Sequence, residues 1–373
     1  MGRLPAILAI LALPVLHAQS ETAATKAYLE EAKKKAEAGN LTSQFFLGED
    51  YNLGLAGVEP NGRQAEHYYK MAAEQGMTGA QYALGVLYFE GQMIPQNYPE
   101  ALRWFRAAAE KELPEAVFFV GVMYDQGLGV PQDYKEAVKW YKITATMKMA
   151  DGQYNLGIMY LNGFGVEKDY GQAARLFQAA VDQRGQVDAE FNLGVLYDNG
   201  QGVPQDYKEA ARLFRASAEQ GQPNAAFNLG LMYANGQGLP QDLTEAAKWY
   251  RRAAEQGVAD AAYNLGVMYA EAQGVAQDYQ QAIRLYRIAA EQGHSDAQFN
   301  LGGMYATGRG APRDDAEAYK WIDLAATKGD PDASNALMRL AARMTAAQVE
   351  SAKQKAAAWS ACKSKPECDL RLK

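Results

Sequence analysis

A two-residue step, leucine or valine followed by glycine, recurs eight times in this 373-residue chain. Its glycines are Gly48, Gly85, Gly121, Gly157, Gly194, Gly230, Gly266 and Gly302. The spacing is 36 residues, and twice it lengthens to 37. An aromatic residue stands three positions before each glycine, and a tyrosine stands three positions after it. This register predicts eight copies of one structural unit that stack on each other along the chain.

Each copy is predicted to form two helices. In the seventh copy, Ala261, Leu265 and Tyr269 are four residues apart and therefore share one face of a first helix. Gly266 lies inside this helix, where glycine costs about 1 kcal/mol relative to alanine. We expect close packing to offset that cost, with an aromatic ring of the partner helix lying over the glycine.

The second helix of every copy opens with the pattern of a capping box, in which two side chains each bond the other residue's backbone amide. The pairs are Asn61 with Gln64, Asn97 with Glu100, Asp133 with Glu136, Asp169 with Gln172, Asp206 with Glu209, Asp242 with Glu245, Asp278 with Gln281 and Asp314 with Glu317. A connector, usually Gly-Val-Pro-Gln-Asp, joins the two helices. Glycine favours the left-handed conformation at the end of the first helix. Ala272 replaces that glycine in the seventh copy and is expected to alter the turn.

Neither helix can bury its apolar face alone, so the units are expected to stack into an all-α solenoid. We predict a signal peptide over 1–20, an N-terminal capping half repeat over 21–40, eight repeats over 41–331 and a terminal segment over 332–373. In the terminal segment, Met338 stands where the repeat glycine is expected, so its first helix is a degenerate ninth copy. Thr345 and Gln348 predict one more capping box, followed by a final helix that covers the array.

The unit resembles the Sel1-like repeat (SLR), on the motifs Ala-x-Phe-Asn-Leu-Gly-x-Met-Tyr, Gly-x-Gly-Val-Pro-Gln-Asp and Glu-Ala-x-x-Trp-Tyr-x-x-Ala-Ala-Glu-Gln-Gly. The likeness extends from Leu41 to about Gly329, and its 36-residue period differs from that of the 34-residue tetratricopeptide repeat. The resemblance implies a right-handed α/α superhelical solenoid that acts as a scaffold in protein quality control, envelope assembly or host interaction. Cysteine-rich relatives carry a disulfide in each repeat and are linked to penicillin binding or hydrolysis. This chain lacks those cysteines, so that activity is not carried over.

Tetratricopeptide arrays suggest where a partner would bind. There the residue two before the repeat glycine often faces the concave groove, where asparagine can bond the backbone of an extended peptide. Here that position holds Asn155, Asn192, Asn228, Asn264 and Asn300, whereas Phe46, Ala83 and Phe119 occupy it in the first three copies. We therefore predict a groove for a protein or peptide partner in copies four to eight. The alternative is that each amide bonds a neighbouring loop carbonyl, since most buried side-chain amides are satisfied locally.

A stripe of methionines lies one turn further along the same helices. Its members are Met123, Met159, Met232, Met268 and Met304. Methionine can form an adaptable binding surface, but at a regularly repeated helical position it is interpreted as filling the core.

Charge and residue types argue against several other functions. A net charge of −7, a pI near 5.3 and the lack of a basic stripe argue against binding to nucleic acid. Beyond 1–20 the chain contains two histidines, His67 and His294, and shows no arrangement of nucleophile and base. We therefore predict no catalysis, no cofactor and no metal. A cell-wall-related enzyme or enzyme subunit of the β-lactamase or penicillin-binding kind, and a purely structural spacer, are the alternatives.

The first residues and the cysteines predict export. Arg3 precedes an apolar run from Leu4 to Leu16, a pattern typical of a secretory signal peptide. Because this run is too short to span a bilayer comfortably, we expect a periplasmic or secreted protein without stable membrane insertion, and an uncleaved anchor is the alternative. Cys362 and Cys368 are the two cysteines of the chain. In an exported protein they are expected to form a disulfide, and a two-cysteine metal site is the weaker alternative.

Overall fold

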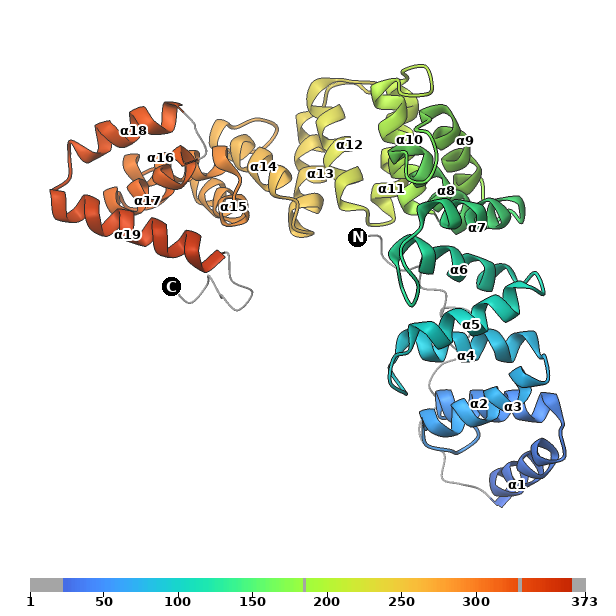
Figure 1. The fold of residues 1–373 in the computed structure, drawn as a ribbon. Helices are drawn as coiled ribbons and strands as arrows, with labels where there is room; N and C mark the ends of the chain where they lie inside the picture. The colour runs from blue at the N-terminus through green and yellow to red at the C-terminus, as the bar shows by residue number, and fades with distance from the viewer. Residues whose placement is uncertain (1–22, 184–185, 328–330, 364–373) are drawn as a thin grey trace. The chain divides into compact units, whose positions relative to one another are not determined.

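The computed structural model describes residues 23–183, 186–327 and 331–363, and every regular element in these ranges is an α-helix (Figure 1). The first helices of the eight repeats, called A helices below, are α2 (Leu41–Leu53), α4 (Thr78–Glu90), α6 (Pro114–Gln126), α8 (Ala150–Asn162), α10 (Val187–Asn199), α12 (Pro223–Asn235), α14 (Ala259–Glu271) and α16 (Ser295–Thr307). The second helices, called B helices, are α3 (Gly62–Glu74), α5 (Tyr98–Ala109), α7 (Tyr134–Thr146), α9 (Tyr170–Val181), α11 (Tyr207–Glu219), α13 (Leu243–Glu255), α15 (Tyr279–Gln292) and α17 (Asp315–Ala326). Three further helices flank them: α1 (Ala23–Glu37), α18 (Pro331–Ala341) and α19 (Ala346–Lys363).

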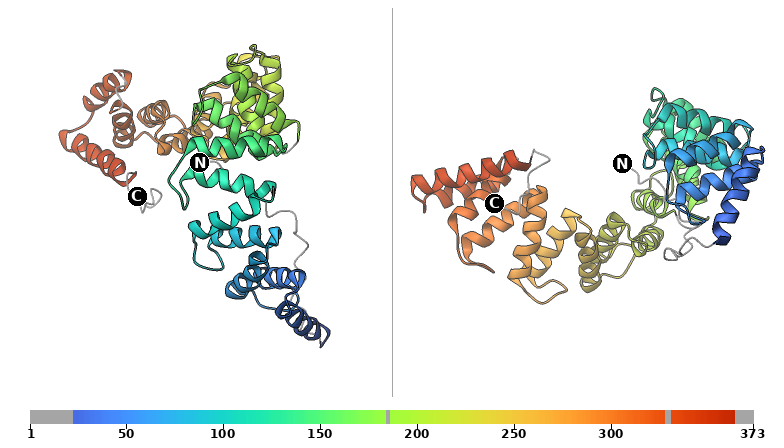
Figure 2. Two further views of the ribbon diagram at one scale, coloured as in Figure 1. Left: turned by 45° about the vertical axis from the view of Figure 1, so that its right-hand side comes forward. Right: turned by 90° about the horizontal axis from the view of Figure 1, so that it is seen from below.

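The helices form two units, 1–189 and 190–373, which we call unit 1 and unit 2. Within each unit an A helix packs on the B helix that follows it, and that B helix packs on the next A helix. Consecutive helices therefore lie side by side in chain order (Figures 1 and 2). This succession of helix pairs is an α-solenoid, as the sequence predicts.

A ring packed over glycine joins the two helices of a repeat. A Cβ atom added to Gly266 would lie 2.8 Å from the Tyr286 ring, and one added to Gly85 would lie 2.7 Å from the Phe105 ring. The rings that cover the repeat glycines are Tyr69, Phe105, Tyr141, Phe177, Phe214, Tyr250 and Tyr286. The eighth repeat uses Ile322 in place of a ring. The predicted contact is therefore confirmed in seven repeats, and only glycine leaves room for it.

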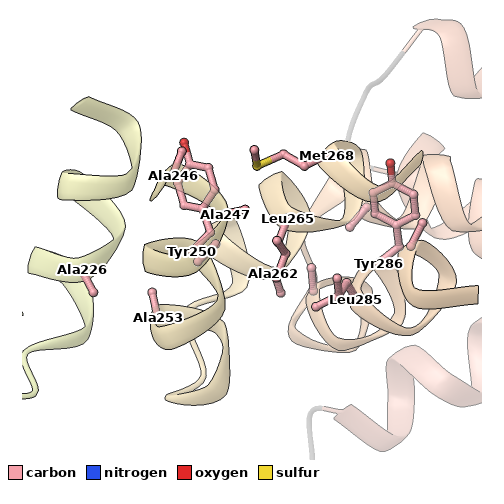
Figure 3. Close-up of a cluster of buried hydrophobic side chains, with 14 of the residues drawn as sticks. Ala226, Ala246, Ala247, Tyr250, Ala253, Ala262, Leu265, Met268, Leu285 and Tyr286 are labelled. Atoms are coloured by element: carbon pink, nitrogen blue, oxygen red, sulfur yellow. The ribbon is translucent and has the colours of Figure 1, made fainter. Parts of the chain in front are cut away.

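Small and flexible apolar side chains fill the space around these rings. The fourth residue of every B helix is an alanine that is fully buried: Ala65, Ala101, Ala137, Ala173, Ala210, Ala246, Ala282 and Ala318. All five methionines of the stripe are buried as well, which confirms that they fill the core. Figure 3 shows this core in unit 2, where Tyr250 and Tyr286 lie on opposite sides of the helix that carries Leu265 and Met268.

The capping prediction is correct for one half of the motif and wrong for the other. In all eight B helices the Asn or Asp side chain accepts a hydrogen bond from the amide of the third helical residue. The amide of the Asn or Asp itself, however, donates to the carbonyl of the tyrosine three positions after the repeat glycine. Asp278 N lies 3.0 Å from Tyr269 O, and the other seven repeats have the same bond. Because this bond satisfies the amide, the following glutamate is free to pair with a cation, as Glu245 does with Lys248 at 2.5 Å.

The connector is held by its glutamine and by a left-handed residue. In five repeats the glutamine amide donates to a carbonyl seven residues earlier, at the end of the A helix: Gln96 to Phe89, Gln132 to Asp125, Gln205 to Asp198, Gln241 to Ala234 and Gln277 to Ala270. Ala272 has φ 60° and ψ 36°, the conformation that glycine has in the other repeats. The expectation that Ala272 alters the turn is therefore wrong, because alanine accepts a strained conformation that the surrounding bonds impose.

Successive repeats approach each other so closely at one backbone contact that one partner has to be glycine. A Cβ atom on Gly274 would lie 2.5 Å from Leu243 O, at the start of the preceding B helix. The same place in the second repeat holds Met93, and there the glycine is on the other partner, Gly62. A Cβ atom on Gly62 would lie 2.6 Å from the Met93 carbonyl carbon. The contact between repeats therefore requires a glycine, but this glycine can lie on either of the two segments that meet.

At the N-terminal end α1 packs on α2. The buried Gln44 of α2 donates to the Ala36 carbonyl of α1 at 2.8 Å. Asp50 occupies the position that methionine or leucine fills in the other repeats, and it bonds Tyr28 of α1. Burial raises the pKa of Asp50, and the bond from Tyr28 opposes this rise.

The C-terminal helices follow a different pattern from the repeats. Met338, at the position of the repeat glycine, is 66% exposed, so this position is not covered by a ring as the repeat glycines are. Helix α19 packs on α17 instead, with the rings of Trp359 and Trp321 5.6 Å apart. The predicted capping box is confirmed here in both halves, since Thr345 N donates to Gln348 Oε1 at 2.8 Å and Gln348 N donates to Thr345 Oγ1 at 3.3 Å.

Candidate functional site

One face of every A helix is not packed into the core. It consists of the residues six and two positions before the repeat glycine and one and five positions after it, which fall on one side of a helix by their spacing. The fifth position after the glycine is exposed in all eight repeats, and most of the other residues on this side are half-buried. A Cβ atom on Gly303, one position after the repeat glycine, would meet nothing within 4 Å. We call this side the open face.

The five predicted binding asparagines lie at the centre of this face. Asn155 is on α8 in unit 1, and Asn192, Asn228, Asn264 and Asn300 are on α10, α12, α14 and α16 in unit 2. All five are half-buried. The structure therefore brings four of them into one unit, at the same position of successive A helices.

Three of these asparagines bond a tyrosine of the preceding B helix. Asn264 bonds the hydroxyl of Tyr250, Asn300 bonds that of Tyr286, and Asn155 bonds that of Tyr141. Burial raises the pKa of Tyr250 to about 12, and the amide of Asn264 opposes that rise by donating to the phenol oxygen. These amides are thus tied to a neighbouring repeat through a hydroxyl.

Asn228 differs from Asn264 and Asn300 in this respect. The residue fourteen positions before Asn228 is Phe214, whereas Tyr250 and Tyr286 stand fourteen positions before the other two. Phe214 covers Gly194 of its own repeat, as Tyr250 covers Gly230 and Tyr286 covers Gly266, but it has no hydroxyl. The Asn228 amide is therefore not used in this hydrogen bond between repeats.

Charges are segregated between the two kinds of helix. No A helix contains lysine, arginine or histidine, whereas every B helix contains at least one lysine or arginine. The glutamates near the start of B helices pair with cations three residues further on, as Glu100 does with Arg103 at 3.0 Å and Glu209 with Arg212 at 2.6 Å. Within the described residues, Asp260 of α14 is an A-helix carboxylate that forms an ion pair. Its Oδ1 atom lies 3.4 Å from Nε2 of His294.

Several A-helix carboxylates are partly desolvated, and among the described residues no ion pair compensates them. Burial raises the pKa of Glu90 in α4 and of Asp198 in α10. Burial also raises the pKa of Asp125, which accepts a bond from the neutral hydroxyl of Tyr141 at 3.3 Å. The sequence analysis missed this feature, although the lack of cations in all A helices is readable in the sequence.

The two histidines named in the sequence analysis both pack against aromatic rings. His67 packs edge-on against Tyr68 in unit 1. In unit 2, His294 caps α16 by accepting from Ala297 N at 3.2 Å, and its ring stacks on Tyr263. No group of three metal-ligating side chains occurs in 23–183, 186–327 and 331–363. A shallow depression of about 280 Å³ lies along α11, lined by Lys208, Arg212 and Arg215 among others, and its lining residues are not on the open face.

Two further predictions concern the ends of the chain. The predicted signal peptide, 1–20, lies outside the described residues, as does Cys368. Cys362 is buried near the end of α19. Within the part of the chain that the structure describes, we find no helix with the length and apolar character needed to cross a membrane.

Comparison with known proteins agrees with this architecture. The family model described as Sel1 repeat matches eight segments: 41–77, 78–113, 114–148, 150–184, 187–222, 223–258, 259–294 and 295–330. The chain belongs to the Sel1-repeat family, whose members are protein-interaction scaffolds and generally do not catalyse reactions. No match was found among the curated proteins.

Two solved structures are similar over most of the chain. One is a protective antigen present in uropathogenic Escherichia coli strains, which displays an SLR fold. It is 35% identical, with a TM-score of 0.80, and the match covers 88% of this chain and 71% of that one. The other is a Sel1 repeat protein from Oxalobacter formigenes, 30% identical with a TM-score of 0.66, and the match covers 89% of this chain and 99% of that one.

Proposed function

We propose that this protein is an exported, non-catalytic scaffold that holds a protein or peptide partner on the open face of the A helices in unit 2. The observation that carries this proposal is the half-exposed asparagine at the same position of four successive A helices. An asparagine amide offers two donors and an acceptor, so it can bond both the N–H and the C=O groups of an extended backbone. Repetition at one position suits a partner that runs across the helices.

The hydrogen bonds to tyrosine determine how much of each asparagine amide is left for a partner. Asn264 and Asn300 already donate to a hydroxyl, and their carbonyl oxygens are left as acceptors for the partner. Asn228 has no tyrosine at the corresponding position and offers its whole amide. Asn235, exposed at the end of α12, lies on the same face as Asn228 and adds a second amide. The strongest contact within unit 2 is therefore expected at the sixth repeat. Asn155, on α8 in unit 1, is a separate candidate.

Export is proposed from the apolar run and single arginine at the start of the sequence. The similar Escherichia coli protein is described as a protective antigen, which supports a place outside the cytoplasm. We propose that the partner is met in the bacterial envelope or at the host interface. Cell fractionation tests this: the full chain is expected in the periplasm or medium and a chain without residues 1–20 in the cytoplasm. Equal distribution of the two chains would contradict export.

The binding proposal is tested by affinity capture from an envelope extract, with captured proteins identified by mass spectrometry. Changing Asn192, Asn228 and Asn264 together to alanine is expected to abolish capture of a specific partner while circular dichroism shows unchanged helicity. The matched control is Gln280→Ala, which removes an exposed amide from a B helix. Unchanged capture by the triple variant, or equal loss with the control, would refute binding at this face.

A further inference from the structure

The open face of unit 1 differs from that of unit 2 in being aromatic and acidic. Phe46 of α2 is 53% exposed, the highest exposed fraction among the described aromatic side chains. Glu49 lies one turn further along the same helix and accepts a bond from the Tyr69 hydroxyl at 2.6 Å. Leu53, another turn on, is 45% exposed. The face of α2 therefore presents apolar side chains on both sides of a carboxylate that a neutral donor holds in place.

The next two A helices continue this combination. The rings of Tyr82 in α4 and Phe119 in α6 are 6.1 Å apart, and Phe119 also stacks on Phe105 at 4.9 Å. Burial, together with the nearby charges of Glu115 and Glu90, raises the pKa of Tyr82 to about 12. Two carboxylates thus lie near the half-buried Tyr82, and Phe119 is one turn from Glu115 on α6. We use the name acidic–aromatic face for five residues at open-face positions and for Tyr82, which lies one position beside that face: Phe46, Glu49, Tyr82, Glu90, Glu115 and Phe119.

Among the described residues, no ion pair joins Glu49, Glu90 or Glu115 to a cation. The ion pairs of unit 1 join residues of α1 or of B helices, such as Glu100 with Arg103 and Glu136 with Lys139. Glu90 is exposed at the end of α4, but the surrounding chain still desolvates its carboxylate enough to raise its pKa. An uncompensated, partly desolvated carboxylate gains free energy when a cation is brought to it. Rings beside it attract the same cation through their faces and cover the apolar stems of lysine and arginine.

We propose that the acidic–aromatic face binds an extended polypeptide segment rich in lysine or arginine. The surface fits this occupant by charge, because it has three carboxylates and its helices contain no cation that would repel the segment. It also fits by chemistry, because a side chain with an apolar stem and a charged end matches a ring beside a carboxylate. The inference rests on the proposed scaffold function, but it concerns a different unit and different residues.

The spacing of the helices indicates how the basic residues of the partner are arranged. Successive A helices meet through their side chains, since the rings of Tyr82 in α4 and Phe119 in α6 are 6.1 Å apart. Helices in such contact lie about 8–10 Å apart, and an extended chain advances about 3.3 Å per residue. A basic side chain at every third residue therefore meets successive A helices. A segment of about twelve residues is long enough to cross α2, α4 and α6.

Fluorescence anisotropy with a labelled peptide tests the proposal. The probe is the twelve-residue peptide of four Lys-Ser-Ser units, titrated with the full chain at low salt, and the comparison probe has Glu in place of Lys. The variant carries Glu49→Gln, Glu90→Gln and Glu115→Gln, which keep shape and the bond from Tyr69. The matched control carries Glu66→Gln, Glu100→Gln and Glu136→Gln, which remove the same charge from B helices of the same repeats.

The Lys probe is expected to bind the parent protein and the control alike, and to bind the open-face variant at least tenfold more weakly. Its affinity should fall with added salt, and Phe46→Ala, which removes an exposed side chain, should weaken binding a fewfold. Equal affinity of the two triple variants, no binding to the parent, or equal binding of the Glu probe would overturn the proposal. The triple asparagine variant of unit 2 should bind the Lys probe normally, so failure here and failure of the proposed function are distinguishable.

Discussion

Units 1 and 2 are built by the same stacking contacts but present different chemistry on their open faces. In both units a ring covers the repeat glycine, except in the eighth repeat, where Ile322 does so, and an Asn or Asp side chain caps the B helix. Two positions before that glycine, however, repeats one to three have Phe46, Ala83 and Phe119, whereas the four A helices of unit 2 have asparagine. The comparison shows that the stack depends on one side of the A helix and leaves the other side free to vary. Partner recognition is therefore expected to differ between the units while their stability has the same origin.

The largest effect should come from removing a ring in either unit. Phe105→Ala in unit 1 and Tyr250→Ala in unit 2 each delete a buried ring that covers a glycine. Each is expected to cost about 3–5 kcal/mol of unfolding free energy, because the space left beside glycine cannot close. Guanidinium unfolding followed by circular dichroism measures the loss. If either variant left the unfolding free energy unchanged, the contact between ring and glycine would not stabilise that unit.

The next effect is a change in unfolding free energy that has opposite signs on the packed side and on the open side of the A helix. Gly85→Ala and Gly266→Ala place a Cβ atom against a ring and are expected to destabilise by about 1–2 kcal/mol, after the gain in helix propensity is included. Gly303→Ala adds a Cβ atom on the open face and should stabilise by about 0.5–1 kcal/mol. Thermal unfolding gives both values. Destabilisation by Gly303→Ala would mean that the open face is packed.

A smaller effect distinguishes the asparagines of unit 2 from each other. Asn264→Ala removes the bond to the buried hydroxyl of Tyr250 and should cost about 1 kcal/mol. Asn228→Ala, with Phe214 at the corresponding position, should change stability by less than about 0.5 kcal/mol. Chemical denaturation of the two variants checks the difference. Equal costs would show that Asn228 also has a structural role and would weaken its assignment to partner binding.

The smallest effect is a pH dependence shared by the two units. Burial raises the pKa of Glu90 in unit 1 and of Asp198 in unit 2, so the folded protein holds these protons more tightly than the unfolded chain. The resulting stability is present below the unfolded pKa and is lost as pH rises through the folded pKa. Glu90→Gln and Asp198→Asn should therefore raise the melting temperature at pH 7, and the difference should shrink toward about pH 4. A difference that grew at low pH would contradict the sign.

The sequence predicts the elements of the fold because their causes are local or repeated. Eight equally spaced glycines predicted the helix pairs, and the cost of Gly266 inside a helix predicted the ring above it. The Asn and Asp caps were correct because their bonds reach only three residues along the chain. The candidate site was predicted only in part: the asparagines do lie on an open face, but their tyrosine partners were missed, because residues fourteen apart in sequence meet only when two helices pack.

By itself the sequence therefore determined the repeat, its two helices, their caps and the glycine contact, since each follows from periodicity or from bonds within one turn. The tertiary structure decided which of the remaining groups meet. In the folded chain the amide of Asp278 donates to the carbonyl of Tyr269, and Ala272 is held in the left-handed conformation. The glycine that the contact between repeats requires is Gly62 in one place and Gly274 in another, and α19 packs on α17. The reason is the same in each case: these contacts form between helices, and only close packing selects one partner from several that the sequence allows.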